Sequence, residues 1–214
     1  MYIPEHFRVR DHESAVQFMR ANPFAILISD NAEAPFATHV PVVIREDGGQ
    51  MVIRGHVARA NPHWQYLQER ARCLMIFHGP HAYVSPSNYA ARENVPTWNY
   101  GAVHAYGEAR VFSEPEELLG VLQDLIPTFE AAYAEQWGSL SEAYRSRMLG
   151  HIVGFEIAVT KIEAKFKLSQ NRTKDEQQKV IESLSAASDT IISGTARLMC
   201  EQDLGLRTES KKQK

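Results

Sequence analysis

The sequence predicts a mainly β protein with inserted helices, in which antiparallel strands form a barrel and a helical extension follows. Short apolar or alternating segments recur about six or seven times, with Gly, Pro and Asn turn signals between them. Few of these segments are separated by a stretch long enough for a parallel crossover. Helical patterns replace strand patterns after residue 170. We therefore expect a barrel domain over residues 1–170 and a helical extension with a polar tail over residues 171–214.

The composition is typical of an ordinary soluble domain. The 214 residues are 44% hydrophobic and 23% charged, with a net charge of −3. No run approaches the ~20 apolar residues of a membrane span, and the N-terminus lacks the apolar core of a secretory signal. Cys73 and Cys200 form no C-x-x-C pair. We expect a cytoplasmic protein without a membrane anchor and without strong nonspecific DNA binding.

Turn and cap signals divide the first half of the chain. Pro41 interrupts a strand pattern and indicates a sheet edge or a bulge. Gly48 and Gly49 after Asp47 are typical of a hairpin turn. Asn61 followed by Pro62 predicts a helix start, with Asn61 as the cap. The expected elements are a helix over 11–21, strands over 24–28, 36–44 and 51–57, a helix over 61–70 and a strand over 72–78.

The second half begins with one strand and continues with helices. Ser113 with Glu116, and Ser139 with Glu142, match the capping-box pattern at helix starts. Pro127 is expected to kink or end the first of these helices. The expected elements are a strand over 103–112, helical segments over 113–127, 129–133 and 139–150, a strand over 152–168, and helices over 174–184 and 190–199.

The strand over 152–168 changes its pattern part-way. Apolar residues fall on odd positions up to Val159 and on even positions from Ile162 onward. Because side chains alternate with a period of two, this change requires an extra residue. We predict a β-bulge near Thr160–Lys161.

The segment Ile76–Gly107 is dense in aromatic and histidine side chains. Pro80, Pro86 and Pro96 are expected to shape loops between short strands here. Aromatic rings beside amides and imidazoles suit a flat ligand with polar edges. An aromatic-rich β core with satisfied polar tips is the alternative interpretation.

The best candidate anion site is the segment Gly55–Pro62, in which a strand leads into a capped helix start. Arg59 offers a guanidinium suited to phosphate, and His56 offers a further donor. Free N–H groups at the helix start add positive potential. The segment is neither a P-loop nor a dinucleotide-binding motif. The alternative is a plain strand-to-helix turn with Arg59 in solvent.

A second polar cluster, Lys165–Arg172, lies at the end of the last predicted strand. It combines three cations with the polar side chains of Ser169, Gln170 and Asn171. The alternative is the solvated face of an edge strand. The two helices that follow are compatible with a helix-turn-helix, but Arg197 is the only cation of the second helix, which disfavours DNA reading by this pair.

Other chemistries have weaker support. His78 and His81 are three residues apart, but no nearby carboxylate or cysteine completes a zinc site, so no metal is expected. Ser85 and Ser87 have no recognisable acid–base partner, and Cys73 lies in an apolar strand pattern. The sequence assigns no catalytic residue.

Several long motifs together resemble the PaiB-like family of FMN-binding negative transcriptional regulators, over nearly the whole chain to about Leu184. The resemblance implies a Greek-key, antiparallel split β-barrel that forms a homodimer and holds FMN at the subunit interface. The matching segments are Met1–Pro4 with Phe7, Ala37–Pro41, Gly55–Pro62 with Trp64, Phe77–Pro86, Val95–Tyr100, Ile152–Phe155 and Lys167–Arg172.

The resemblance also implies roles for individual residues. The FMN phosphate is expected at the 55–62 segment, and the ring edge is expected beside the strand that carries Thr38. A covering surface is expected from the aromatic segment and the second polar cluster, in part from the other subunit. The expected cofactor-binding residues are Thr38, His39, His56, Arg59, Asn61, Trp98, Asn99, Tyr100, Lys167, Ser169 and Gln170.

The family resemblance leaves three functions open. Its name implies repression of protease and sporulation genes, and therefore DNA as a partner. A flavin-dependent oxidoreductase, similar to NAD(P)H:flavin reductases or pyridoxamine-phosphate oxidases, is the alternative, because the protein then positions a flavin that performs the redox step. A flavin-binding module without turnover is the third.

Overall fold

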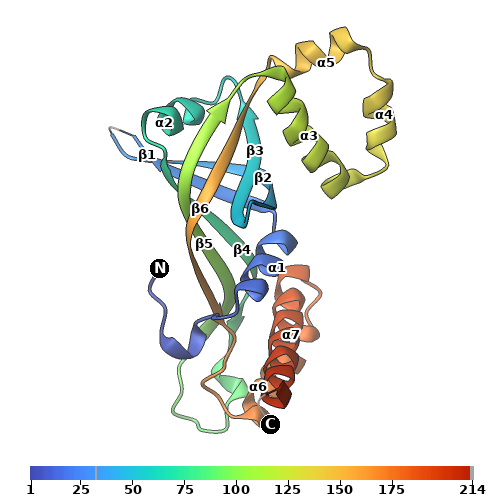
Figure 1. Cartoon of the computed structure of the whole chain (residues 1–214). Coiled ribbons are helices and arrows are strands. Elements are labelled where there is room, and N and C mark those ends of the chain that lie inside the picture. Colours follow the sequence, from blue (N-terminus) through green and yellow to red (C-terminus); the bar gives the residue numbers. More distant parts are fainter. Residues whose placement is uncertain (32, 213–214) are drawn as a thin grey trace. The chain divides into compact units, whose positions relative to one another are not determined.

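Six strands form a closed barrel in the computed structural model, which describes residues 1–31 and 33–212 (Figure 1). Their order around the barrel is β1-β2-β3-β6-β5-β4, and the pairs with an assigned register are antiparallel. The prediction of a mainly β, antiparallel barrel is confirmed. The strands are β1 (Phe24–Asp30), β2 (Pro35–Asp47), β3 (Gln50–Ala58), β4 (Arg72–Val84), β5 (Thr97–Phe112) and β6 (Ile152–Lys167).

Helices fill most of the connections between strands. Among them, α3, α4 and α5 connect the end of β5 to the start of β6 (Figure 1). Within the described residues, no helix is long and apolar enough to cross a membrane. The helices are η1 (Glu5–Phe7), α1 (His12–Ala21), α2 (His63–Glu69), η2 (Pro86–Asn88), α3 (Pro115–Glu130), α4 (Tyr133–Ser139), α5 (Glu142–Leu149), α6 (Lys174–Ser185) and α7 (Thr190–Lys212).

Strand β2 changes its neighbour at Pro41. The pairing with β1 ends at Pro41, opposite Phe24, and the pairing with β3 begins at Val42, opposite Gly55. Proline has no N–H to donate, so it is tolerated where one ladder gives way to the next. The predicted sheet edge is wrong, because the barrel is closed.

The hairpin predicted between the second and third strands is confirmed. Asp47 pairs with Gln50, which leaves a two-residue loop. Gly48 and Gly49 have φ values of 56° and 84°. Both values lie in the left-handed region, as a type I′ turn requires, and glycine adopts this region without steric cost.

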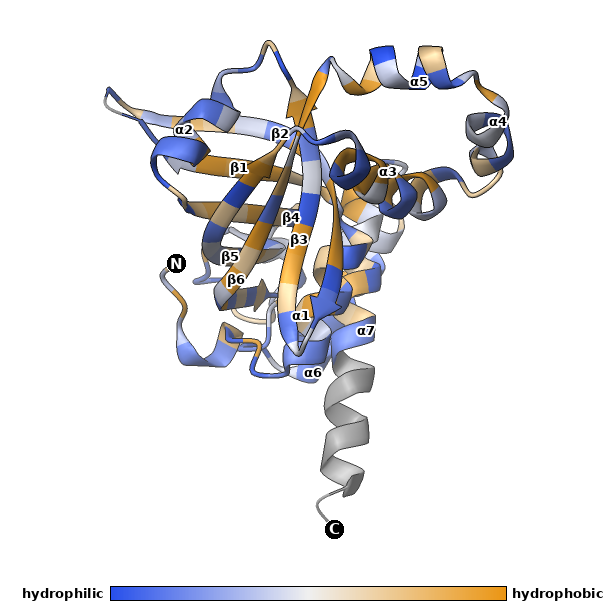
Figure 2. Cartoon of the chain, turned by 45° about the horizontal axis from the view of Figure 1, so that its top comes forward, coloured by the Kyte–Doolittle hydropathy of each residue, from blue (hydrophilic) through white to orange (hydrophobic). Residues whose placement is uncertain are grey.

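The aromatic segment forms parts of two long strands, β4 and β5, and Pro86 and Pro96 lie in the connection between them, as predicted. Pro80 lies inside β4, which contradicts the predicted loop at that position. In β4 the buried positions change from odd (Met75, Phe77) to even (Ala82, Val84) across Gly79–Pro80. Figure 2 shows hydrophobic and hydrophilic residues alternating along the strands.

Strand β6 shows the predicted change of alternation. Phe155 and Ile157 are buried, and after Thr160–Lys161 the buried positions are Ala164 and Phe166. The β-bulge that we propose as the cause stays a prediction.

Several predicted helix boundaries need correction. Helix α3 starts at Pro115 without a side-chain cap from Glu114, and it continues through Pro127 to Glu130. Helix α5 is capped by Ser141, which accepts from the Tyr144 N–H, so the predicted box at Ser139 is wrong. Both expected boxes failed because Ser and Glu three residues apart also occur beside helix ends.

The C-terminal helices begin where they were expected. Thr173 and Glu176 form a capping box at the start of α6. Helix α7 runs to Lys212, past the predicted end at Met199 and into the segment expected to be a frayed tail; residues 213–214 lie outside the described part.

The chain divides into two compact units, which the barrel strands β4, β5 and β6 pass through. Unit 1 comprises Met1–His12, His78–Ala102 and Ala164–Lys214, and unit 2 comprises Glu13–Phe77 and Val103–Glu163. The predicted extension over 171–214 therefore shares unit 1 with barrel residues.

Unit 2 has an apolar cluster between α3 and the barrel strands. It combines side chains from β2, β5, α3 and α5, and a Cβ added at Gly154 would lie 2.3 Å from the Phe112 ring, so this approach requires glycine. The buried members are Val43, Phe112, Leu118, Val121, Leu125 and Leu149.

Candidate functional site

In unit 2 the turn from β3 into α2 is tied to the start of β6 by Arg59. The Arg59 Nε donates to the Gly150 carbonyl oxygen at 2.8 Å, and Nη2 donates to the Ile152 carbonyl oxygen at 3.0 Å. The Arg59 backbone N–H donates to the His151 carbonyl oxygen at 2.7 Å. Arg59 is exposed but held, and it has no carboxylate partner in the described part of the chain. Arg59 is thus exposed to solvent, as the alternative interpretation expected, while its guanidinium is held in one orientation by two carbonyl oxygens.

The same turn is held from inside by Thr38, Asn61 and His63. Asn61 Nδ2 donates to Thr38 Oγ1 at 3.1 Å, and His63 Nδ1 lies 2.7 Å from that oxygen. Asn61 Oδ1 accepts from the His63 N–H at 3.0 Å, which is the predicted capping contact, although helix α2 is assigned from His63. Together the three side chains fix the turn that carries Arg59.

His63 is fully buried, and sequence reasoning did not select it. Burial lowers the pKa of His63 to about 4, so the ring is neutral at pH 7. Its Nε2 has no hydrogen-bond partner among the described residues. The signal that could have found it is its place two residues after the Asn61 cap.

Thr38 and His39 point to opposite faces of β2, because neighbouring side chains in a strand alternate. Thr38 is half-buried beside Asn61, whereas His39 is exposed and stacks on Phe24 with ring centroids 6.1 Å apart. The two residues therefore do not present a joint polar edge from their side chains.

His56 is a half-buried histidine on β3 in the predicted anion segment. Its Nδ1 is buried without a hydrogen-bond partner in the described residues. Burial lowers the pKa of His56, which favours the neutral ring. A buried ring nitrogen without a partner carries a free-energy cost that a ligand could relieve.

Unit 1 carries an exposed aromatic and cationic face. Trp98 has its ring centroid 5.8 Å from that of His81 and 6.3 Å from that of Tyr83. Lys167 Nζ donates to Thr97 Oγ1 and, at 2.7 Å, to the Trp98 carbonyl oxygen. Trp98 of β5 therefore has an exposed ring, and its carbonyl oxygen fixes the ammonium group of Lys167 in β6.

Three other predicted residues of unit 1 bond to protein groups. Asn99 and Ser169 are buried, and Asn99 Nδ2 donates to Ser169 Oγ at 2.9 Å. Ser169 has a φ of 65°, which is uncommon for a residue other than glycine. Gln170 accepts from the Leu168 N–H and donates to the Phe166 carbonyl oxygen. These bonds indicate a structural role, in which they hold the strand exit.

Histidine and cysteine chemistry adds little. The His78 and His81 ring centroids lie 4.9 Å apart, and burial together with His81 lowers the pKa of His78. In the described chain no three His, Cys, Asp or Glu side chains gather into a metal site. Burial raises the pKa of Cys73 to about 12, so this thiol is unreactive at neutral pH.

Comparison with known proteins decides the family. A sequence profile described as "Putative FMN-binding domain" matches residues 1–161. The chain belongs to this FMN-binding family. FMN is accordingly its cofactor.

Relatives support the same assignment. The chain is 38% identical over 201 residues to "Protease synthase and sporulation protein PAI 2" of Bacillus subtilis, which covers 93% of this chain and 96% of the relative. This match confirms the PaiB-like resemblance. The chain is also 31% identical over 208 residues to the uncharacterized protein AN0679 of Emericella nidulans, over 77% of this chain and 82% of the relative.

Solved structures show the fold. The flavocytochrome Anf3 of Azotobacter vinelandii has a TM-score of 0.61 at 15% identity, over 78% of this chain and 72% of that chain. The FAD and heme binding protein of Mycobacterium smegmatis has a TM-score of 0.60 at 14% identity, over 80% of this chain and 78% of that one. The FMN-binding family member described here thus has the expected split-barrel fold.

The residues of unit 2 fit the phosphate of FMN. A phosphate dianion needs a fixed cation and further donors. Arg59 is exposed, oriented by two carbonyl oxygens and without a carboxylate partner in the described residues. These bonds use two of the five N–H donors of the guanidinium. Arg59 can therefore hold an anion without giving up the bonds that position it.

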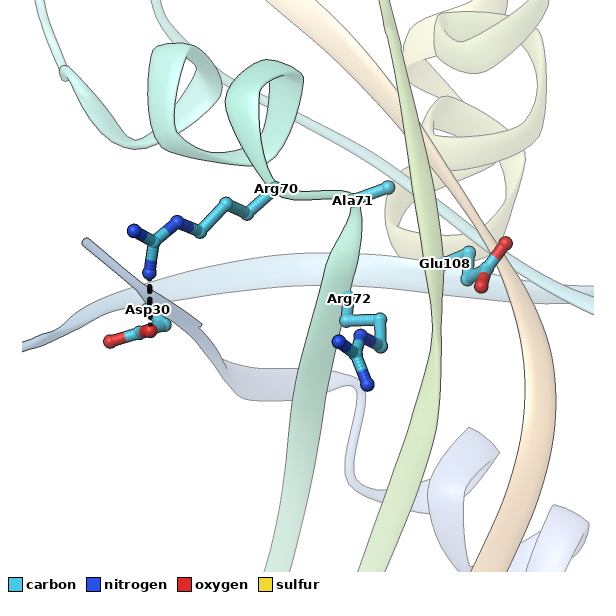
Figure 3. Close-up of a pocket in the computed structure, with 5 residues that line it drawn as sticks. All are labelled: Asp30, Arg70, Ala71, Arg72 and Glu108. Carbon is cyan, nitrogen blue, oxygen red and sulfur yellow. Dashed lines mark hydrogen bonds and ion pairs between the residues drawn. The ribbon is translucent and has the colours of Figure 1, made fainter. Parts of the chain in front are cut away.

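One surface cavity of unit 2, of about 750 Å³, contains none of the predicted cofactor residues. Figure 3 shows Arg70 paired with Asp30 on one side and Glu108 on the other, with Arg72 between them. The Arg70–Asp30 pair is 2.7 Å long, and both side chains are more than half exposed. Such exposed pairs contribute little stability, and the cavity has no role in the flavin site proposed below.

Proposed function

We propose that this protein is a flavin-responsive regulator of gene expression that acts as a homodimer with FMN at the contact between subunits. The observation that carries this proposal is the 38% identity, over nearly the full length of both chains, to a protein named for protease synthesis and sporulation. That name describes cellular programmes and not a metabolic reaction. The regulator class is therefore preferred to an enzyme.

Different residues of unit 2 have different roles in binding FMN. Arg59 binds the phosphate, and Thr38, Asn61 and His63 keep the turn in place. When bound, FMN supplies a ring that exists in oxidised and reduced forms. The contribution of the chain is to orient the cofactor and to respond to its state.

Exposed aromatic side chains support a dimer. Phe24 is 64% exposed and stacks on His39, which is exposed as well. Large exposed apolar side chains that lie together are typical of interaction surfaces. Phe24 with His39 in unit 2 forms such a group.

The test combines a spectrum with a DNA-binding measurement. Purified protein reconstituted with FMN is expected to show the visible bands of bound flavin and to sediment as a dimer. It is then mixed with fragments from upstream of its own gene and of protease genes, at physiological salt, with the flavin oxidised or reduced. Specific binding that depends on flavin state is expected.

The rival outcome is equally clear. Saturable flavin reduction by NADH or NADPH, without specific DNA binding in either state, would assign the chain to the flavin-dependent oxidoreductases. Stable flavin binding with neither property would leave a binding module.

A further inference from the structure

Unit 1 holds cations in a setting that differs from an ordinary charged surface. Lys165 is 8% exposed, and its Nζ donates to the Tyr2 carbonyl oxygen at 3.3 Å. The same Nζ lies 5.2 Å from the Tyr100 ring centroid and 5.7 Å from the Tyr2 ring centroid. Neither Lys165 nor Lys167 has a carboxylate partner in the described part of the chain.

A third cation lies within electrostatic reach. Both Lys165 and Arg172 lower the pKa of Lys167, after the larger effect of its burial. Arg172 packs over the Tyr89 ring at 3.8 Å and donates to Asn94 Oδ1 at 2.8 Å. The Glu176 carboxylate accepts from the N–H groups of Ala90 and Thr173, and these bonds together with the charge of Arg172 lower its pKa, so Arg172 is partly compensated within the chain whereas the two lysines are not.

Gathering like charges in partly buried positions raises the free energy of the folded chain unless an anion compensates it. Carbonyl oxygens and rings orient the ammonium groups of Lys165 and Lys167 but do not neutralise their charge. The arrangement therefore favours an anionic ligand.

One residue of this face combines an exposed ring with a backbone bond to a cation. The Trp98 carbonyl oxygen accepts from Lys167, so the residue that carries the ring also orients the ammonium group. Because the Trp98 ring is 51% exposed, a flat group can stack on its open part.

We propose that this face of unit 1 binds a planar aromatic anion, a carboxylate or a phosphate on a ring, as a second ligand besides FMN. The ring of the ligand stacks on Trp98, and its anionic group is held by Lys167 with support from Lys165 and Arg172. In a regulator this ligand is the effector; in an oxidoreductase it is the substrate. The inference does not depend on which function the protein has.

The test uses FMN-loaded full-length protein. Trp fluorescence is followed during titration with 1-naphthoate and with 1-naphthyl phosphate. The neutral 1-naphthylmethanol tests the need for charge, and inorganic phosphate tests the need for a ring. Saturable binding of at least one ring anion is expected, with the neutral ring and the bare anion each at least about tenfold weaker, since each lacks one of the two contacts.

Variants locate the site. Lys167→Met is expected to weaken ring-anion binding about tenfold, because it removes one charge-assisted contact. Trp98→Leu is expected to weaken it to a similar degree, as followed by competition or calorimetry. The matched control Lys179→Met removes an exposed charge from α6 in the same unit and is expected to change affinity less than about twofold.

The FMN content of each variant, read from the visible spectrum, separates this inference from the proposed function. Intact FMN content with lost ring-anion binding supports a second ligand. Loss of FMN from Lys167→Met would overturn it and would assign the cations to the flavin. Absence of any saturable binding to the unmodified protein would overturn it as well, whatever the DNA measurements show.

Discussion

Partly buried cations have different bonding partners in the two units. In unit 2, Arg54 has a side chain 16% exposed and lies 2.7 Å from Asp124 and 2.8 Å from Glu156. In unit 1, Lys165 and Lys167 bond to carbonyl oxygens, a hydroxyl and rings, without carboxylates in the described residues. The ion pairs of unit 2 attach α3 to the barrel. The cations of unit 1 keep their charge available.

The partners of a cation indicate whether its removal should affect mainly stability or mainly ligand affinity. A cation matched by carboxylates is neutralised within the chain, so its removal should affect stability. A cation oriented by neutral groups retains its attraction for an anion, so its removal should affect ligand affinity first. Arg59 in unit 2 follows the pattern of unit 1, which supports its assignment to the phosphate.

The largest effect is expected from breaking the network of unit 2. Arg54→Met leaves Asp124 and Glu156 without their shared partner and should lower the free energy of unfolding by about 3 kcal/mol. Urea unfolding measures this change. Arg45→Met is the control, because its side chain is 55% exposed although it also pairs with Asp124, and it should cost at most about 1 kcal/mol. Equal losses would contradict the comparison.

The buried His63 should make stability depend on pH. Its folded-state pKa is about 4 against 6.5 for an ordinary histidine, so the unfolded chain binds the proton more readily between these values. Stability from this residue is complete above pH 6.5 and is lost as the pH falls toward 4, by up to about 3 kcal/mol.

Urea midpoints between pH 4 and pH 7 test this effect. His63→Gln should flatten the dependence in this range, whatever its effect on stability at pH 7. An unchanged slope in the variant would show that another group titrates.

Substitution of Arg59 tests whether a cation of unit 2 that lacks a carboxylate partner in the described residues affects flavin affinity. Arg59→Ala should weaken FMN about 10- to 100-fold and riboflavin only about twofold, since riboflavin lacks the phosphate. Fluorescence quenching measures both. Arg70→Ala, which removes an exposed ion-paired arginine, should leave both affinities unchanged. Equal weakening of both flavins by Arg59→Ala would mean that Arg59 only shapes the turn.

The smallest effect is expected at Arg172. Arg172→Lys keeps the charge but loses the planar contact with Tyr89 and the bond to Asn94, at about 1 kcal/mol. Hydrogen exchange in residues 85–96 should become faster, while exchange in unit 2 stays the same. Uniform acceleration in both units would show a global effect instead.

Local signals in the sequence predicted much of the fold. The glycines of the 48–49 turn, the Asn61 cap and the alternation of β6 each follow from the chemistry of a few neighbouring residues. The strands with which a segment pairs cannot be predicted from a few neighbouring residues. Pro80 suggested a loop because proline is rare inside a strand. Its place within β4 depends on neighbouring strands that are far away in sequence.

The candidate site shows the same division. Arg59 could be proposed as a phosphate ligand from its place at a strand-to-helix turn, but its two carbonyl partners lie about 90 residues away and could not be predicted. Asn99 and Ser169 were expected at the cofactor because the family resemblance implied it. The structure shows that they bond to each other across 70 residues of sequence, and their place at the cofactor stays a prediction. Local sequence could not reveal that these polar groups already have partners.

The change of neighbours at Pro41 has a mechanical consequence. Strand β2 is paired with β1 only up to Pro41 and with β3 only from Val42, and one further bond joins the Val42 N–H to the Pro23 carbonyl oxygen. A force that separates β1 from β2 is expected to break the hydrogen-bonded pairs between these two strands up to Pro41. The pairs between β2 and β3, which begin at Val42, would remain. A single proline thus marks the boundary between two hydrogen-bonded ladders along one strand.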